Sequence, residues 1–182
     1  MRRKLTKLPY RRKLEGKTDY KRRLLILKSK KPMLVIRKTN KYIIAQIIVF
    51  DKKGDRVLFS ANSKELSKYG WNLSFKSIPA AYLTGLLLGK KASKEVKEAI
   101  LYLGLQEKGN RLFAALKGVV DAGLNIPHNP EVFPSDDLIS GKHIQAYLEQ
   151  NYQEHNKNQF LKYKGVNVEE LFNKVRDKIK SE

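Results

Sequence analysis

The 182-residue sequence contains no cysteine. This absence excludes disulfides, thiolate nucleophiles, iron–sulfur clusters and cysteine-based zinc sites. Histidine is scarce as well: the three residues, at positions 128, 143 and 155, show no spacing of three or four that would place two ligands on one helix face. We therefore expect no metal and no other cofactor.

Long apolar runs are also missing. The two longest, residues 42–50 and 78–88, are shorter than the roughly 18 to 20 residues that cross a bilayer. The N-terminus carries cations and a proline where a secretory signal would be apolar. We expect a cytoplasmic protein with no membrane partner.

Acidic residues are few relative to basic ones, since 18 Asp and Glu stand against 38 Lys and Arg, a formal net charge of +20. The excess is concentrated, because residues 1–41 hold 17 basic and two acidic residues, a net charge of +15. Such segregation favours a polyanionic partner and not a small-molecule substrate. We expect residues 1–30 to be a basic RNA-binding arm that becomes ordered on contact with RNA.

Aromatic residues are interleaved with the cations of this arm. Tyr10 and Tyr20 stand beside basic triplets, a mixture that pairs with phosphates and stacks on unpaired bases. The second half of the arm is predicted to be helical, with Leu24, Leu25 and Leu27 docked on the core. The predicted RNA-binding residues of the arm are Arg2, Arg3, Lys4, Lys7, Tyr10, Arg11, Arg12, Lys13, Lys17, Tyr20, Lys21, Arg22 and Arg23.

The sequence after the arm alternates strand and helix patterns. Residues 33–37, 42–50 and 56–61 are rich in β-branched and aromatic residues and are separated by turn sequences, which predicts an antiparallel meander. The second of these strands is apolar on both faces, so we expect it to be covered on both sides. Residues 100–105 and 124–127 should add strands through helical crossovers. We predict a three-layer α/β/α fold on a mixed five-stranded sheet.

The predicted helices have recognisable starts. Ser77 can cap an apolar helix, and Asn110 can cap a second one. In the first helix, Ala81, Gly85 and Gly89 recur every four residues. Such a stripe of small residues would let this helix lie close to the sheet.

The chain is thereby divided into three parts: the arm over residues 1–30, an α/β domain over 31–150, and a C-terminal helical extension over 151–182. The extension ends in a helix that Asn167 can cap. Its apolar stripe should pack on the domain or on a partner, and consists of Leu171, Phe172, Val175 and Ile179.

Signals for catalysis are weak, and we expect no enzyme. A phosphate-binding loop needs four residues between its glycines and a Ser or Thr after the lysine, whereas residues 85–91 have three and a second lysine. A metal-dependent nuclease would need Asp51 or Asp121 to converge with further carboxylates. Turn and cap roles explain these acids better, and Asp121 can form a specific hydrogen bond at the end of its helix.

A stronger signal lies at the tip of the first hairpin. Residues 37–42 combine cations, an amide and an aromatic ring, which fits RNA loops and bulges, although a solvated turn is the alternative. Trp71 is open to base stacking or to simple anchoring of its loop. Residues 110 and 111 place a cation and N–H groups at a helix N-terminus, a common phosphate site. The predicted RNA-binding residues outside the arm are Arg37, Lys38, Asn40, Lys41, Tyr42, Trp71, Asn110 and Arg111.

Taken in order, these segments resemble the archaeal form of the family of universal large-subunit ribosomal protein eighteen, the 5S-rRNA-binding protein. The resemblance runs from about Leu8 to Leu148. The segments that carry it are residues 10–24, 35–37 with Asn40, 44–47, 79–85, 113–118, 121–124 and 126–128.

The resemblance implies a ribonuclease-H-like topology of the kind found in translation components, no enzymatic activity, and a place in the central protuberance of the large subunit. The implied partners are 5S rRNA, the large-subunit rRNA and neighbouring proteins, including protein five. A general RNA-binding chaperone outside the ribosome is the alternative. The residues to which the resemblance assigns RNA contacts are Arg11, Arg12, Lys13, Lys17, Tyr20, Arg22, Arg23, Arg37, Asn40 and Tyr42.

Overall fold

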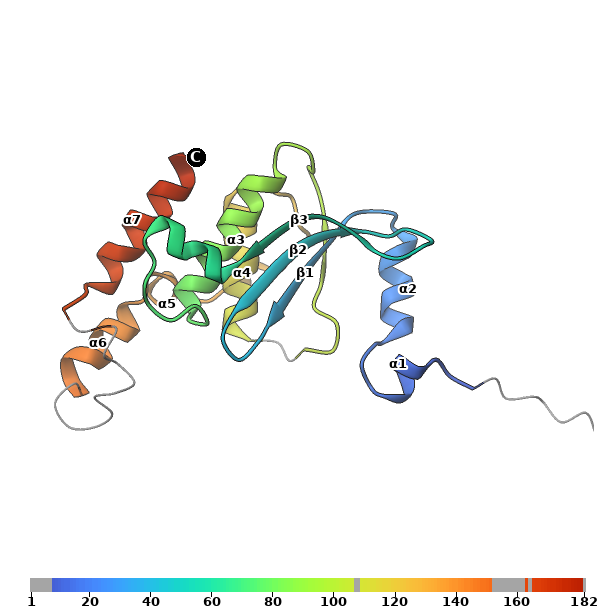
Figure 1. Cartoon of the computed structure of the whole chain (residues 1–182), viewed down its shortest axis with the longest axis horizontal. Helices are drawn as coiled ribbons and strands as arrows, with labels where there is room; N and C mark the ends of the chain where they lie inside the picture. Colours follow the sequence, from blue (N-terminus) through green and yellow to red (C-terminus); the bar gives the residue numbers. More distant parts are fainter. Residues whose placement is uncertain (1–7, 107–108, 152–162, 164, 182) are drawn as a thin grey trace, which may run out of the picture.

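The computed structural model describes residues 8–106, 109–151, 163 and 165–181. Within these residues, a sheet is formed by the strands β1 (Met33–Lys38), β2 (Ile43–Val49), β3 (Arg56–Asn62) and β4 (Ile100–Tyr102) (Figure 1). Their order is β3-β2-β1-β4. β2 pairs antiparallel with both β1 and β3, and β4 pairs parallel with β1. The predicted meander and the mixed sheet are therefore confirmed.

The predicted fifth strand is wrong. Of residues 124–127, only Asn125 forms a bridge, and that bridge is isolated from the sheet. Pro127 has no N–H with which to continue the pairing. β4 is also shorter than the expected 100–105, because Gly104 turns the chain with a φ of 65°.

Helices α3 (Ile78–Ala92) and α4 (Asn110–Asp121) pack together and cover one face of the sheet. The Ser77 hydroxyl accepts a hydrogen bond from the Ala80 N–H at 3.4 Å, the predicted cap of α3. α4 begins differently from the prediction, because Gly109 is its N-cap and Asn110 its first residue. α3 is buried nearly all round, as its composition predicted.

The small-residue stripe of α3 faces α4, so the expectation that it faces the sheet is wrong. A Cβ built on Gly85 would lie 2.0 Å from the carbonyl oxygen of Ala115 in α4. A Cβ on Gly118 of α4 would lie 2.1 Å from the carbonyl oxygen of Tyr82 in α3. The two helix backbones are thus in direct contact, at a spacing that only glycine permits on both sides.

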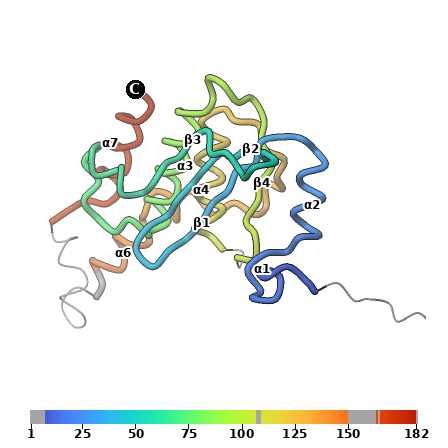
Figure 2. The backbone as a smooth tube through the Cα atoms, turned by 45° about the vertical axis from the view of Figure 1, so that its right-hand side comes forward, coloured from blue at the N-terminus to red at the C-terminus, as the bar shows by residue number. Residues whose placement is uncertain are grey.

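The opposite face of the sheet is covered only at one end. Helix α1 (Arg11–Leu14) is followed by α2 (Tyr20–Lys28), which runs beside the sheet (Figure 2). Ile26 and Leu27 of α2 pack on a small cluster formed by Met33, Val35, Ile48 and Tyr102. Leu24 and Leu25 are 57% and 66% exposed, so their predicted docking on the core is wrong. β2 is consequently not covered on both faces along its length, as the sequence had suggested.

The C-terminal part adds α5 (Asp136–Ser140), α6 (Lys142–Asn151) and α7 (Val168–Ser181), and 3-10 helices cover Ser63–Tyr69 and Pro130–Val132. Phe172, Val175 and Ile179 of α7 are buried in the same core as α3. The stripe therefore packs on the domain. The Asn167 side chain accepts hydrogen bonds from two N–H groups of the first turn, as predicted. The three-part division of the chain stays a prediction.

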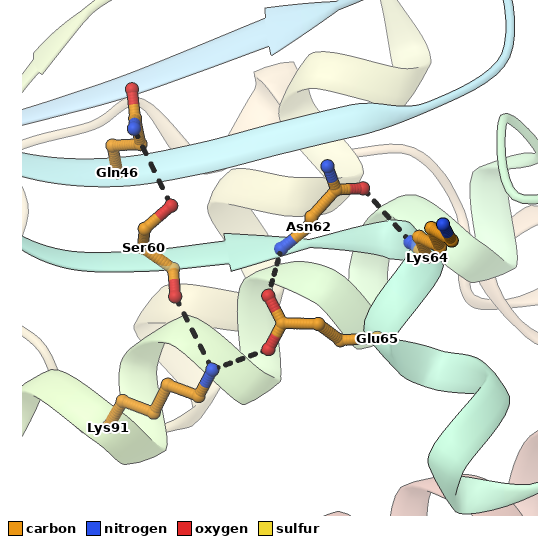
Figure 3. A network of polar contacts seen from close by, with 6 residues as sticks. All are labelled: Gln46, Ser60, Asn62, Lys64, Glu65 and Lys91. Carbon is orange, nitrogen blue, oxygen red and sulfur yellow. Dashed lines mark hydrogen bonds and ion pairs between the residues drawn. The ribbon is translucent and has the colours of Figure 1, made fainter.

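β3 is the edge of the sheet beside β2, and a polar network occupies it (Figure 3). The Lys91 ammonium lies 3.3 Å from the carbonyl oxygen of Ser60 and 2.6 Å from the Glu65 carboxylate, which also accepts the Asn62 N–H at 2.9 Å. Burial alone would raise the pKa of Glu65, but the bonds from Lys91 and Asn62 outweigh it and lower the pKa. Two backbone groups of the edge are thereby satisfied, which discourages pairing with another chain.

Candidate nucleic-acid interface

The turn that joins β1 and β2 lies between the arm and the C-terminal helices (Figures 1 and 2). The Thr39 N–H donates to the Tyr42 carbonyl at 2.8 Å, and the Tyr42 N–H donates to the Thr39 hydroxyl at 2.9 Å. Asn40 and Lys41 are exposed at the apex, whereas the Tyr42 ring is half-buried, 6.0 Å from that of Phe75. The closed turn therefore fixes the backbone from which the amide of Asn40 and the ammonium group of Lys41 project.

A groove of about 1100 Å³ lies on the open face of the sheet at β1 and β4, between the arm, the β1–β2 turn, the turn at residues 51–55 and residues 103–106. We call it the arm groove. The basic residues that line it are Arg12, Lys17, Arg23, Arg37, Lys38, Lys52 and Lys53. Its described lining contains two acids, Asp51 and Asp55, so seven basic and two acidic residues give a net charge of +5. A lining of this charge suits a phosphate backbone.

One ion pair fixes the width of the arm groove. A guanidinium nitrogen of Arg23 in α2 lies 2.6 and 2.7 Å from the two carboxylate oxygens of Asp55. Both side chains are mostly buried, and the hydrogen bond to Asp55 raises the pKa of Arg23. The pair ties the arm to the β2–β3 turn and neutralises Arg23. The attraction for a polyanion therefore comes from the other cations of the groove.

The arm has local structure of its own. Glu15 pairs with Lys17 at 2.8 Å and with Arg11 at 2.6 Å, and hydrogen bonds from Lys17 and then Arg11 lower its pKa. The rings of Tyr10 and Tyr20 pack together with centroids 5.1 Å apart. Tyr20 lines the arm groove. The described part of the arm is thus helical at α1 and α2.

A second groove, of about 650 Å³, lies on the other side of the β1–β2 turn, where α3 and α4 begin. We call it the helix groove. Lys38 lines both grooves, and Lys76, Arg111 and His143 line the helix groove alone. Asn110 lies beside Arg111, as the sequence predicted. The described lining contains no Asp or Glu.

Apart from Tyr42, which is half-buried and lines neither groove, and Trp71, the predicted RNA-binding residues fall into four groups. Those in the arm groove are Arg12, Lys17, Tyr20, Arg23, Arg37 and Lys38. Those in the helix groove are Lys38, Asn110 and Arg111. Those elsewhere on the exposed surface of the arm and the turn are Tyr10, Arg11, Lys13, Lys21, Arg22, Asn40 and Lys41. Those outside the described residues are Arg2, Arg3, Lys4 and Lys7.

Trp71 does not belong to the interface. Its side chain is 1% exposed, and its indole N–H donates to the carbonyl oxygen of Ser74 at 3.3 Å. A ring with no free face cannot stack on a base. The base-stacking interpretation is therefore wrong, and the indole anchors its loop.

Several residues that line the arm groove were not predicted from the sequence. Lys52 and Lys53 lie in a turn at the far end of β2 from the β1–β2 turn, and the arm together with residues 102–106 joins both ends into one groove. Gln106 braces the end of β1, since its side chain accepts the Lys38 N–H at 2.9 Å and donates to the Ile36 carbonyl at 2.7 Å. The two adjacent lysines in the turn at residues 51–54 were the sequence feature that could have identified this end of the groove.

The candidate catalytic acids Asp51 and Asp121 both accept hydrogen bonds within the fold. The Tyr82 hydroxyl donates to Asp121 at 2.8 Å, which confirms the predicted hydrogen bond at the end of α4. Burial, together with this bond, raises the pKa of Tyr82. In the described part of the chain, no group of three or more His, Asp or Glu is placed to hold a metal ion. No helix there is both long and apolar enough to cross a membrane.

Two comparisons with known proteins place this chain in a family. A family described as "Ribosomal large subunit proteins 60S L5, and 50S L18" matches residues 4–108. The chain is also similar to "Large ribosomal subunit protein uL18" of Korarchaeum cryptofilum (strain OPF8), with 54% identity over 146 residues, which is 79% of this chain and 75% of the relative. The family match spans the arm and all four strands. The chain therefore belongs to the family of ribosomal large subunit proteins that comprises 60S L5 and 50S L18.

Proposed function

We propose that the chain is a structural component of the large ribosomal subunit, in the cytoplasm, that binds 5S rRNA and attaches it to the large-subunit rRNA. The observation that carries the proposal is the arm groove, in which cations of the arm, the β1–β2 turn and the β2–β3 turn line one continuous channel. Family membership supports a ribosomal RNA as the polyanion. The role is one of binding and positioning, without an enzymatic step.

The parts of the chain suit different contacts. The arm groove and the exposed apex of the β1–β2 turn would hold 5S rRNA, while the basic N-terminus before residue 8 would reach the large-subunit rRNA. This arrangement would place the protein in the central protuberance, beside protein five. The ribonuclease-H-like topology that the resemblance implies stays a prediction.

The proposal predicts a steep dependence of the affinity on salt. If the protein neutralises about ten phosphates, the slope of log affinity against log salt is about −7 to −9. The triple variant Arg37→Gln, Lys52→Gln and Lys53→Gln removes three unpaired cations of the arm groove. The slope should then become shallower by about 2 to 3.

The test is a titration of labelled 5S rRNA with the full chain at about 200 mM salt, in the presence of excess tRNA. The matched control is Lys94→Gln, Lys97→Gln and Lys174→Gln, which removes the same charge from exposed lysines that line neither groove. The arm-groove variant should lose at least tenfold in affinity, and the control much less. Binding that tRNA erases would overturn the proposal and leave a general RNA-binding chaperone outside the ribosome.

A further inference from the structure

The β1–β2 turn has a positively charged groove on each side. The arm groove lies toward α1 and the helix groove toward α6, and both views show the turn between these two helices (Figures 1 and 2). Lys38 at the base of the turn lines both grooves. The turn is therefore a ridge that separates two channels of the same charge.

The basic residues of the helix groove come from four separate segments, and three of them, Lys38, Lys76 and Arg111, are cations. Lys38 ends β1, Lys76 precedes α3, Arg111 lies in the first turn of α4, and His143 lies in α6. Nothing in the local sequence links these four positions. Their convergence in one groove is a property of the fold.

The charge of the helix groove is uncompensated within the described residues, where its lining has no acid. In a neighbouring pocket, the positive charges are paired with acidic side chains. There, Lys117 lies 2.5 Å from Asp136, and Lys142 lies 2.9 Å from Asp137. The cations of that pocket are balanced by the protein itself, whereas those of the helix groove are left for an external anion.

We propose that the helix groove binds a second RNA backbone, so that the β1–β2 turn enters the minor groove of an RNA duplex with one strand on either side. The inference rests on the proposed function and specifies the shape of RNA that the interface recognises. The minor groove of A-form RNA is wide and shallow and displays 2′-hydroxyls and base edges. The amide of Asn40 and the ammonium of Lys41 at the exposed apex are the groups that would meet them.

The first experiment is hydroxyl-radical footprinting of 5S rRNA bound to the full chain. The helix-groove variant is Lys76→Gln with Arg111→Gln, the arm-groove variant is Arg37→Gln with Lys52→Gln, and each removes two charges. The matched control is Lys94→Gln with Lys97→Gln. Thermal unfolding of each variant verifies that the domain stays folded.

Wild-type protein should protect two backbone stretches that face each other across a minor groove. The helix-groove variant should lose one stretch and the arm-groove variant the other, while the control keeps both. Each groove variant should also make the salt slope shallower by about 1.4 to 1.8. If wild-type protein binds 5S rRNA and the helix-groove variant keeps both stretches, the inference is wrong while the proposed function stands.

A second experiment does not depend on 5S rRNA. Wild-type protein is titrated with a 20-base-pair RNA duplex and with a single strand of the same sequence, at equal phosphate concentration. The inference predicts tighter binding of the duplex, and a loss of that preference in the helix-groove variant. Equal or tighter binding of the single strand would overturn it, whatever the outcome with 5S rRNA.

Discussion

Helices α3 and α4 cover one face of the sheet along its length, whereas α2 covers the other face only at one end. On the covered face, Leu34, Ile36 and Ile47 are fully buried in the large core. On the open face, Ile44 and Gln46 are only half-buried, and Val57 of the edge strand, which pairs with Ile48, is exposed. A full helical cover there would bury more apolar surface, but it would fill the channel that the arm groove occupies. The incomplete cover leaves the arm groove open, and this groove is where we propose that RNA binds.

If the covered face holds the fold together, a methyl group placed between α3 and α4 should have the largest effect on stability. Gly85→Ala puts a Cβ 2.0 Å from the backbone oxygen of Ala115, which cannot move without shifting α4. Overpacking costs about 1 to 3 kcal/mol, and a backbone clash lies at the upper end, far above the gain of about 0.5 to 1 kcal/mol in helix propensity. Urea unfolding should show a loss of about 3 kcal/mol.

Gly109→Ala is the control for this prediction. Its Cβ meets nothing within 4 Å, and its φ of −176° is extended backbone that alanine adopts freely. Its free energy of unfolding should stay within about 0.5 kcal/mol of wild type. Equal stability of Gly85→Ala and wild type would show that the two helices can separate, and that the covered face is not the rigid side of the molecule.

The open face should respond differently to loss of packing. Leu27→Ala removes a half-buried side chain from the small cluster under α2. Full burial of a leucine makes this substitution cost about 2 to 5 kcal/mol, so partial burial gives about 1 to 2 kcal/mol. The loss should appear as faster hydrogen exchange of the α2 amides, with slow exchange retained in α3 and α4.

Leu25→Ala on the same helix is the matched control, because Leu25 is 66% exposed and lies outside both cores. It should leave the exchange of α2 unchanged. If Leu27→Ala instead accelerated exchange in α3 as much as in α2, the arm would unfold together with the core, and the two faces would not be independent.

The covered face was largely predictable because its elements carry local signals. The three strands of the meander were expected within two residues of their bounds, and the caps of α3 and α7 follow from Ser77 and Asn167. The predictions fail where the local sequence does not indicate which apolar side chains of a helix face the core. Residues 24–27 are four consecutive apolar residues, and only the packed helix shows that Ile26 and Leu27 turn inward while Leu24 and Leu25 do not.

The interface was predictable only in part for the same reason. Composition located the arm and the β1–β2 turn, since both concentrate cations in a few residues. It did not locate Lys52, Lys76 or His143, which join the grooves through contacts between distant segments. Trp71 is the opposite case, since it was predicted as an RNA-binding residue but its ring is buried. A single aromatic residue in a polar stretch gives the same sequence pattern whether its ring is buried or exposed.

The smallest effect should come from the edge of the sheet, where Glu65 links Lys91 to the N–H of Asn62. Glu65→Gln keeps an acceptor for Asn62 but loses the ion pair. Because this pair is partly exposed, its loss should cost only about 0.5 kcal/mol at pH 7. Urea unfolding at pH 7, 5 and 3 measures the difference, with the exposed Glu95→Gln as the control.

The direction of the pH dependence follows from the lowered pKa of Glu65 in the folded protein. A carboxyl with a lowered folded-state pKa contributes stability above its unfolded-state pKa, and this contribution is lost as the pH falls through the folded-state value. Wild type should therefore be more stable than Glu65→Gln at pH 7, and the difference should shrink between pH 5 and pH 3, where the pH passes below the ordinary pKa of a glutamate. A constant difference at all three pH values would mean that the network acts through hydrogen bonds alone. Hydrogen bonds would then protect the edge strand without a contribution from charge. The open face differs, because positive charge is the main property of its groove.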